Sequence, residues 1–184
     1  MREIEIKLKV KNLEELENKL IKSGFKISKE IKQHDIIYTN ANKHGNFDNI
    51  KEGNIVLRIR KEGNISKMTL KQEKTNEMDN LEYETDVSNP EETHQIFLAL
   101  GWKPEVEVKK IRKKGKIGDY ELCLDSVEQL GNFIELEKMT KDNDDPQKVR
   151  KELFDTLRPF GFSEADEETK GYDTQIYNLN KNNK

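Results

Sequence analysis

Pairs of glutamates alternate with apolar residues in three separate short segments of this chain. They are Glu3 and Glu5 in the segment EIEIK, Glu82 and Glu84 in EYE, and Glu135 and Glu137 in IELE. Carboxylate oxygens bind hard cations such as Mg²⁺ and Mn²⁺. Glutamate is depleted in β-strands, so the repeated pattern works against local propensity, as residues at functional sites often do. We therefore interpret these acids as candidate metal ligands or lining residues of a site.

Basic residues follow the same alternation on further segments. The six strongest candidates are Lys7, Arg58, Arg60, Lys71, Lys110 and Arg112. Arginine and lysine side chains bind phosphate oxygens through charge-assisted hydrogen bonds. A polyphosphate that carries metal ions needs both carboxylates and cations, so the two sets are chemically complementary.

The elements that must position these residues are mostly strands. Ile4, Ile6, Leu8 and Val10 share one face of a predicted strand, and the charged residues share the other. Further strands are expected at 25–39, at 55–74 as a hairpin that turns at Gly63 and Asn64, and at 81–87, 106–114, 116–127 and 132–139, with turn signals at Gly115, Gly118 and Gly131. About eight strands, mostly adjacent in sequence, predict antiparallel pairing.

Three main helices are expected. The first begins after the N-cap Asn12 and ends near Gly24, the second lies between Pro90 and Gly101, and the third begins at Pro146 with Asp145 as its cap. The polar segment 40–54 is long enough to act as a lid over a site. We expect a single domain over residues 1–178 and a frayed tail over 179–184.

Two architectures fit strands that have one apolar and one charged face. An open sheet would expose its charges to water, whereas a closed barrel covered by the helices would enclose them in its lumen. The pattern alone leaves both open. One segment breaks the parity, because Val106 and Val108 share a face with Lys110 and Arg112, which a β-bulge could explain.

The composition narrows the possible partners and compartment. The 33 basic and 36 acidic residues give a net charge of -3, so no overall field would attract nucleic acid or an anionic membrane. Cys123 is the single cysteine, no signal peptide is visible and no apolar run approaches the roughly 20 residues that span a bilayer. We expect a cytoplasmic protein that binds no nucleic acid and no membrane.

The ordered motifs resemble a known family. The segment at 3–7 resembles the Glu-x-Glu-x-Lys signature of the CYTH, or triphosphate tunnel metalloenzyme, superfamily. Seven further pieces follow in the family's order: LRIR at 57–60, LK at 70–71, EYE at 82–84, KIR at 110–112, LD at 124–125, LGNFIELE at 130–137 and KGY at 170–172. Their spacing is most similar to the class IV adenylate cyclase branch. The resemblance implies an α+β fold with an eight-stranded antiparallel closed β-barrel whose lumen is charged.

The resemblance also implies a role for each matching residue. The implied metal ligands are Glu3, Glu5, Glu135 and Glu137, with Asp125 nearby, and they would hold Mg²⁺ or Mn²⁺, two ions in all. The implied triphosphate-binding residues are Lys7, Arg58, Arg60, Lys71, Lys110 and Arg112, with Lys9 and Lys170 as weaker candidates. Glu82, Glu84, Asp35 and Tyr172 would line the tunnel and orient the cations. The implied catalytic residues are Glu5, Lys7, Asp125, Lys110 and Arg112.

One departure from the family is visible at DIIY, where Ile37 stands at a position that is often tyrosine. It leaves Asp35 as a lining candidate and makes Tyr38 a weaker one.

Several functions remain open from the sequence. The first is an adenylate cyclase of the class IV type, and the second is a triphosphatase that hydrolyses tripolyphosphate, thiamine triphosphate or a nucleotide. Both reactions need the same clamp around a small-molecule triphosphate. A non-catalytic module that binds polyphosphate or a nucleotide is a third alternative, and the protein would act as a monomer or a homodimer.

Overall fold

The computed structural model describes residues 2–40, 47, 52–141 and 143–182. The strands and helices, in chain order, are β1 (Arg2–Val10), α1 (Leu13–Lys22), β2 (Lys26–Ile27), β3 (Ile31–Thr39), β4 (Ile55–Glu62), β5 (Ile65–Asn76), β6 (Asp79–Asp86), α2 (Pro90–Ala99), β7 (Lys103–Ile117), β8 (Tyr120–Val127), β9 (Gly131–Thr140), α3 (Pro146–Leu157) and α4 (Tyr172–Asn182). Segment 40–54, which we predicted as a lid, lies mostly outside the described residues.

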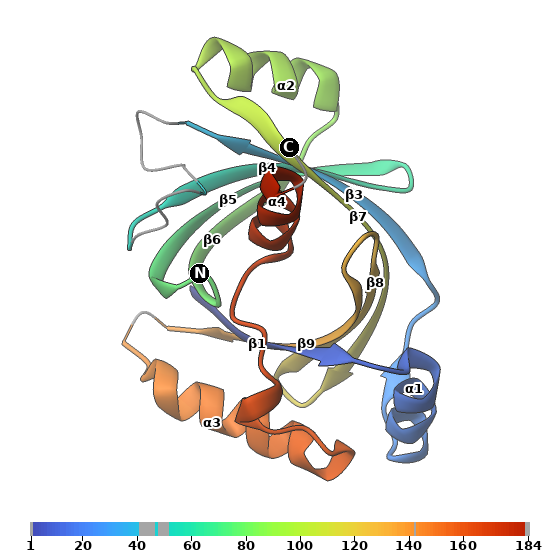
Figure 1. Cartoon of the computed structure of the whole chain (residues 1–184). Helices are drawn as coiled ribbons and strands as arrows, with labels where there is room; N and C mark the ends of the chain where they lie inside the picture. The colour runs from blue at the N-terminus through green and yellow to red at the C-terminus, as the bar shows by residue number, and fades with distance from the viewer. Residues whose placement is uncertain (1, 41–46, 48–51, 142, 183–184) are drawn as a thin grey trace.

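Eight of the strands close into an antiparallel barrel. Their order around the ring is β7-β3-β4-β5-β6-β1-β9-β8, and the pairing of β7 with β8 closes it (Figure 1). The short strand β2 pairs with the end of β7 outside this ring. The predicted eight-stranded closed β-barrel is therefore confirmed.

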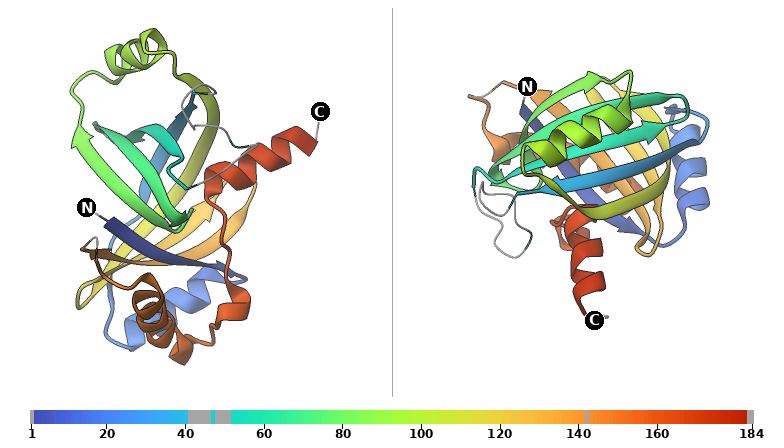
Figure 2. Two further views of the ribbon diagram at one scale, coloured as in Figure 1. Left: turned by 90° about the vertical axis from the view of Figure 1, so that its left-hand side faces the viewer. Right: turned by 90° about the horizontal axis from the view of Figure 1, so that it is seen from above.

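The apolar faces of the strands point outward and are covered by helices. On one side, Ile4, Ile6 and Leu8 of β1 are fully buried, together with apolar residues of β8 and β9, beneath α1 and α3. On the opposite side, α2 covers a second cluster that includes Tyr38 and Phe97 (Figure 2). The charged faces consequently line the inside of the barrel, which decides between the two architectures that the sequence left open.

The predicted helix starts are confirmed. The side chain of Asn12 accepts a hydrogen bond from the backbone N–H of Glu15, and that of Asp145 accepts one from Gln147. These side chains satisfy amide groups that the first helical turn cannot pair itself. Gly24, just beyond α1, has a φ of 93°, which suits a glycine that ends a helix.

Local turn and strand predictions were wrong at two places. Gly115 lies within β7, and the turn into β8 comes at Gly118, which has a φ of 55°. The predicted strand over 25–39 is two strands, β2 and β3. A Cβ at Gly115 would come within 2.8 Å of Ile27, so this glycine permits the close approach of β2 rather than a turn.

No β-bulge separates the two valines of β7 from its two cations. Val106, Val108, Lys110 and Arg112 are all buried, and the register shift between β3 and β7 comes earlier in β7, between the pairs Ile37–Val106 and Tyr38–Pro104. The two valines face an apolar cluster inside one end of the barrel that includes Phe133, Tyr172 and Ile176. One end of the lumen is therefore apolar, which we did not predict.

Helix α4 is a fourth main helix, whereas the sequence predicted three. Helix α4 includes residues 179–182, where we expected a frayed tail. Its first turns are held by burial of Tyr172, Thr174 and Ile176 at the barrel end, while its C-terminal half projects away from the barrel (Figure 2). Among the described helices, none is long and apolar enough to cross a membrane.

The core outside the barrel predicts that two neighbouring residues of α1 contribute very differently to the free energy of unfolding. Leu20 is fully buried and Ile21 is 50% exposed. Leu20→Ala should lower the free energy of unfolding by about 2–5 kcal/mol because it leaves a cavity, whereas Ile21→Ala should change it by less than about 1 kcal/mol. Urea denaturation followed by circular dichroism measures both, and equal effects would contradict the helix-covered barrel.

Candidate active site

The barrel encloses a cavity of about 430 Å³ that is lined by charged side chains from all eight strands. The predicted site residues that line it are Glu3, Glu5, Lys7, Asp35, Arg58, Arg60, Lys71, Glu82, Glu84, Lys110, Arg112, Glu135, Glu137 and Tyr172. Alternation along each strand places every second side chain in the lumen, so closure of the ring brings residues more than 100 positions apart into one space.

Three glutamates in this cavity form a carboxylate cluster. Glu5 of β1 and Glu137 of β9 are cross-strand neighbours, and Glu3 is two residues away on the same face. One oxygen from each of the three lies within 4.8 Å of the others. Three hard oxygen ligands at this spacing suit Mg²⁺ or Mn²⁺.

The electrostatics of the carboxylate cluster also favour a cation. Burial, together with the nearby Glu135, raises the pKa of Glu5 to about 7. Burial raises the pKa of Glu137 well above its ordinary value, with the charges of Glu3 and Glu5 adding to the effect, and burial also raises the pKa of Glu3. A divalent cation would remove this repulsion, so these residues fit a bound metal ion.

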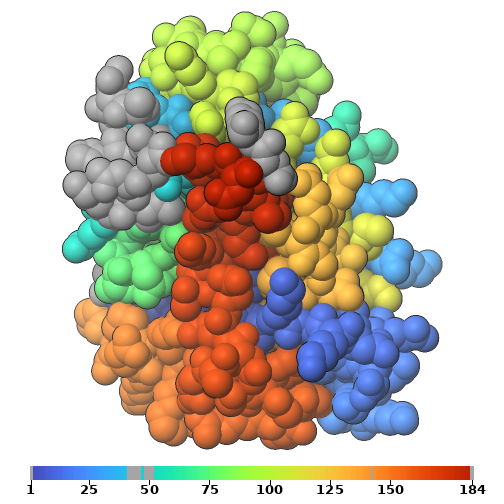
Figure 3. Space-filling view, viewed as in Figure 1, coloured from blue at the N-terminus to red at the C-terminus, as the bar shows by residue number. Residues whose placement is uncertain are grey.

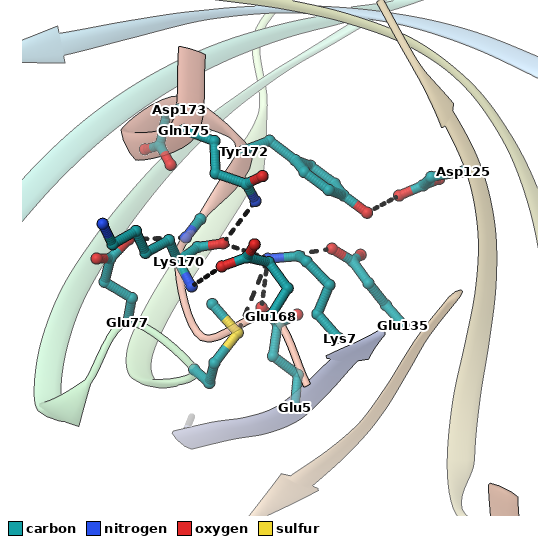
Figure 4. A network of polar contacts seen from close by, with 12 residues as sticks. Glu5, Lys7, Glu77, Asp125, Glu135, Glu168, Lys170, Tyr172, Asp173 and Gln175 are labelled. Carbon is teal, nitrogen blue, oxygen red and sulfur yellow. Dashed lines mark hydrogen bonds and ion pairs between the residues drawn. The ribbon is translucent and has the colours of Figure 1, made fainter. Parts of the chain in front are cut away.

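The other two predicted metal ligands are bound to cations of the protein instead. Arg112 Nε donates to Asp125 Oδ1 at 2.7 Å, and Arg112 Nη2 donates to Glu135. Asp125 also accepts a hydrogen bond from the Tyr172 hydroxyl at 3.0 Å, is fully buried and does not line the cavity (Figure 4). The predicted set of five acids thus divides into the carboxylate cluster and a pair that positions Arg112.

Two of the predicted phosphate-binding cations, Arg60 and Lys71, are held in place by carboxylates. Both oxygens of Asp35 accept hydrogen bonds from Arg60 at 2.7 Å. Lys71 Nζ lies 2.9 Å from a carboxylate oxygen of Glu3 and 2.9 Å from one of Glu82. These contacts orient the cations before any ligand binds.

Two of the cations differ from this pattern. Arg58 is 3.5 Å from both Glu82 and Glu84, a looser arrangement than that of Arg60. Burial lowers the pKa of Lys110 to about 8, and the adjacent charge of Arg112 contributes to the shift. Lys110 Nζ is 3.8 Å from Asp125, its ion-pair partner.

Besides Asp125, two of the predicted cations do not reach the cavity. Lys9 is exposed, with its ammonium 5.8 Å from the centre of the Phe133 ring. The side chain of Lys170 is exposed as well, although its backbone carbonyl accepts a hydrogen bond from Lys7 Nζ at 3.2 Å.

Several charged residues line the cavity without having been predicted. They are Glu62, Lys67, Glu73, Glu77, Lys114, Glu121 and Asp173. Strand parity could have identified Glu62, Lys67, Glu73, Lys114 and Glu121, because each lies an even number of residues from a predicted site residue on its own strand. Glu77 follows the end of β5 and Asp173 opens α4, so no periodicity marks them.

The segment before α4 crosses one end of the barrel. The carboxylate of Glu77 accepts hydrogen bonds from the backbone N–H of Gly171 at 2.7 Å and from the Thr174 hydroxyl at 2.8 Å. The N–H of Glu168 donates to the carbonyl of Lys7 at 2.8 Å. In Figure 3 this segment and α4 cover the centre of the face that Figure 1 shows as a ring, and Figure 4 shows the contacts beneath them.

Comparisons with known proteins agree with this architecture. The CYTH domain family model matches residues 1–172. A candidate adenylate cyclase of Methanocaldococcus jannaschii is 33% identical over 174 residues, which is 94% of this chain and 97% of that protein. A solved structure from Pyrococcus horikoshii superposes with a TM-score of 0.78 at 28% identity, covering 95% of this chain and 98% of that one.

A more distant structure shares the fold alone. It is a candidate adenylyl cyclase from Hippeastrum, described as having a dominant triphosphatase activity, with 17% identity and a TM-score of 0.63, covering 97% of this chain and 95% of that one.

The raised pKa of Glu5 predicts a pH-dependent affinity for metal. A proton on Glu5 competes with the cation, so affinity should rise by about tenfold between pH 6 and pH 8 as the carboxyl near pKa 7 deprotonates. Calorimetric titration with Mn²⁺ in two buffers of different ionisation enthalpy would measure both the affinity and the proton released.

The exposed variant Glu107→Gln serves as the control and should keep the full pH dependence, because Glu107 lies outside the cavity. Constant affinity over this range without proton release would contradict the prediction.

Proposed function

Because the chain belongs to the CYTH domain family, we propose that it is a metal-dependent enzyme of the class IV adenylate cyclase type, which converts ATP into cyclic AMP and pyrophosphate. The name of the Methanocaldococcus relative, at 33% identity over almost the full length of both chains, supports this choice.

The observation that carries the proposal is the composition of the cavity. Six cationic side chains, Lys7, Arg58, Arg60, Lys71, Lys110 and Arg112, face one enclosed space beside the carboxylate cluster. A triphosphate bears several negative charges in a row, and phosphoryl transfer depends mainly on positioning it and neutralising that charge. Few other ligands would use both halves of such a cavity.

The cations of this chain would divide the work of holding the triphosphate. Arg60 is fixed by its two hydrogen bonds to Asp35, and Arg112 by Asp125, so each presents its remaining N–H groups in a set direction. Arg58 and Lys71 contact glutamates that a phosphate can replace as partners. Lys110, with a pKa of about 8, carries its proton at neutral pH and is able to donate it to a phosphate oxygen.

In the cyclase reaction, the ribose 3′-oxygen forms a bond to the α-phosphorus and loses its proton. The bond between the α-phosphorus and the bridging oxygen breaks, and pyrophosphate leaves with the electron pair. Bound Mg²⁺ or Mn²⁺, held by Glu3, Glu5 and Glu137, would supply charge neutralisation and lower the pKa of a coordinated hydroxyl. The barrel residues hold the α-phosphorus in line with its attacking and leaving oxygens.

Triphosphate hydrolysis is the second candidate, because the same clamp would serve a water molecule that attacks the terminal phosphorus. The Hippeastrum protein, which has the same fold, is described as having a dominant triphosphatase activity, so the experiment must also test for hydrolysis.

The products distinguish the two reactions. We expect the purified protein, incubated with ATP and Mg²⁺ or Mn²⁺, to form cyclic AMP and pyrophosphate in equal amounts, as measured by chromatography. Parallel incubation with inorganic tripolyphosphate tests for orthophosphate release. Orthophosphate without cyclic AMP would assign the triphosphatase reaction, and no product from either substrate would overturn the proposed enzyme.

Replacement of one glutamate tests the role of the carboxylate cluster in catalysis. Glu5→Gln should lower kcat by about 100-fold or more, since it removes a metal ligand without changing the shape of the side chain. Exposed Glu107→Gln is the matched control and should retain normal turnover. A non-catalytic binding protein would instead show no turnover in either form, and wild-type rates in Glu5→Gln would exclude the carboxylate cluster from catalysis.

A further inference from the structure

The end of the cavity next to α4 differs chemically from the rest of the lumen. Ile37, Val56 and Val108 line the cavity there and pack into the apolar cluster that also contains Tyr172. Apolar walls of this kind accept a flat organic group and offer nothing to a phosphate.

Three carboxylates lie at the same end of the cavity. Glu73, Glu77 and Asp173 line the cavity there, and no described lysine or arginine forms an ion pair with any of them. Burial raises the pKa of Glu73 to about 7, with Glu77 and Asp173 contributing. The excess of acidic groups at this end favours a ligand group that donates hydrogen bonds or carries positive charge.

Asn54 presents an unpaired acceptor at the same end of the cavity. Asn54 is 5% exposed and lines the cavity, and its Oδ1 has no hydrogen-bond partner in the described part of the chain, while its amide group bonds to Glu73. Because the NH₂ group is committed to a carboxylate, the free atom must be the carbonyl oxygen. Buried acceptors in native proteins are almost always paired, so this oxygen needs a donor that enters the cavity.

The position of this acceptor relative to the phosphate clamp is fixed by strand register. Val56 of β4 pairs with Lys71 of β5, and the backbone N–H of Glu73 donates to the carbonyl of Asn54 at 2.9 Å. The apolar wall, the acceptor and a phosphate-binding cation therefore follow one another along two neighbouring strands.

We propose that this end of the cavity binds the organic head of the triphosphate substrate, that the head is a heterocycle with an amino group, and that Asn54 Oδ1 accepts a hydrogen bond from that amino group. This inference rests on the proposed triphosphate substrate and adds a determinant of base specificity to it. Ile37, Val56 and Val108 contact the ring, and the nearby carboxylates disfavour a head that presents only carbonyl oxygens.

Two other occupants fit these residues less well. Inorganic tripolyphosphate has only acceptor oxygens, which would face Asn54 Oδ1 and three carboxylates. A metal ion needs several oxygens close together, and in the described part of the chain only Glu3, Glu5 and Glu137 bring three within 4.8 Å. An amino-bearing ring satisfies both the unpaired oxygen and the apolar wall.

Binding calorimetry with ATP and with purine riboside 5′-triphosphate, which lacks the amino group, tests the proposal. The wild-type protein should bind ATP roughly tenfold or more tightly, because the deaminated analogue leaves the buried oxygen unpaired. CTP and UTP provide a second pair, in which a carbonyl oxygen replaces the amino group. In Asn54→Leu, the preference for the amino-bearing nucleotide should disappear while affinity for inorganic tripolyphosphate stays unchanged.

The matched control is Gln33→Leu. Gln33 is 3% exposed and its Oε1 is also buried without a hydrogen-bond partner, but it does not line this cavity. This variant should keep the wild-type preference, and thermal melting of both variants checks that they fold. If Asn54→Leu does not fold, the preference of the wild-type protein within each nucleotide pair still tests whether the cavity recognises an amino group.

Equal binding within both nucleotide pairs, or a preference that survives in Asn54→Leu, would overturn this proposal. So would binding of tripolyphosphate without binding of any nucleotide, a result that would leave only the triphosphatase alternative. Failure to bind any triphosphate would instead overturn the proposed function.

Discussion

The structure depends on pairing opposite charges inside a closed barrel. An isolated buried charge is strongly destabilising, and a buried pair with one partner removed leaves the same penalty. Arg112 lies between Asp125 and Glu135, and Arg60 forms two hydrogen bonds with Asp35, so several acids of the lumen are neutralised by the protein itself. Glu3, Glu5 and Glu137 remain as a group with an excess of negative charge that a cation from solution would balance.

This constraint also explains why most of the hydrophobic core lies between the outer surface of the barrel and the helices. Because the lumen is charged, the apolar faces of the strands have to point outward, and they are stable only when other elements cover them. Helices α1 and α3 cover β1, β8 and β9, while α2 covers the opposite side. The helices therefore contribute to the site indirectly, since the charged faces turn inward only when the outer faces have partners.

The sequence was informative wherever a residue's role follows from its immediate neighbours. Alternation placed Glu5, Arg60 and Lys71 on the lumen side, and the caps at Asn12 and Asp145 located two helices. The sequence could not show which acids form the carboxylate cluster and which pair with Arg112. Arg112 of β7 contacts Glu135 of β9, and these two strands are not neighbours, because β8 lies between them. Gly115 was misjudged for a related reason, since only the position of β2 shows that this glycine permits close packing instead of a turn.

The C-terminal segment shows how a single missed element changes the chemistry of a site. Its sequence is mostly polar, and only the family resemblance, which implied that Tyr172 lines the tunnel, placed any of it against the barrel. Yet Tyr172 donates to Asp125, and Lys7 lies 4.5 Å from the centre of the same ring. The segment therefore converts one end of a charged tunnel into a partly apolar pocket, because it brings Tyr172 and Ile176 against Val106 and Val108. A tunnel lined only by charges would suit any polyphosphate equally, whereas a tunnel with one apolar end distinguishes an organic triphosphate from an inorganic one.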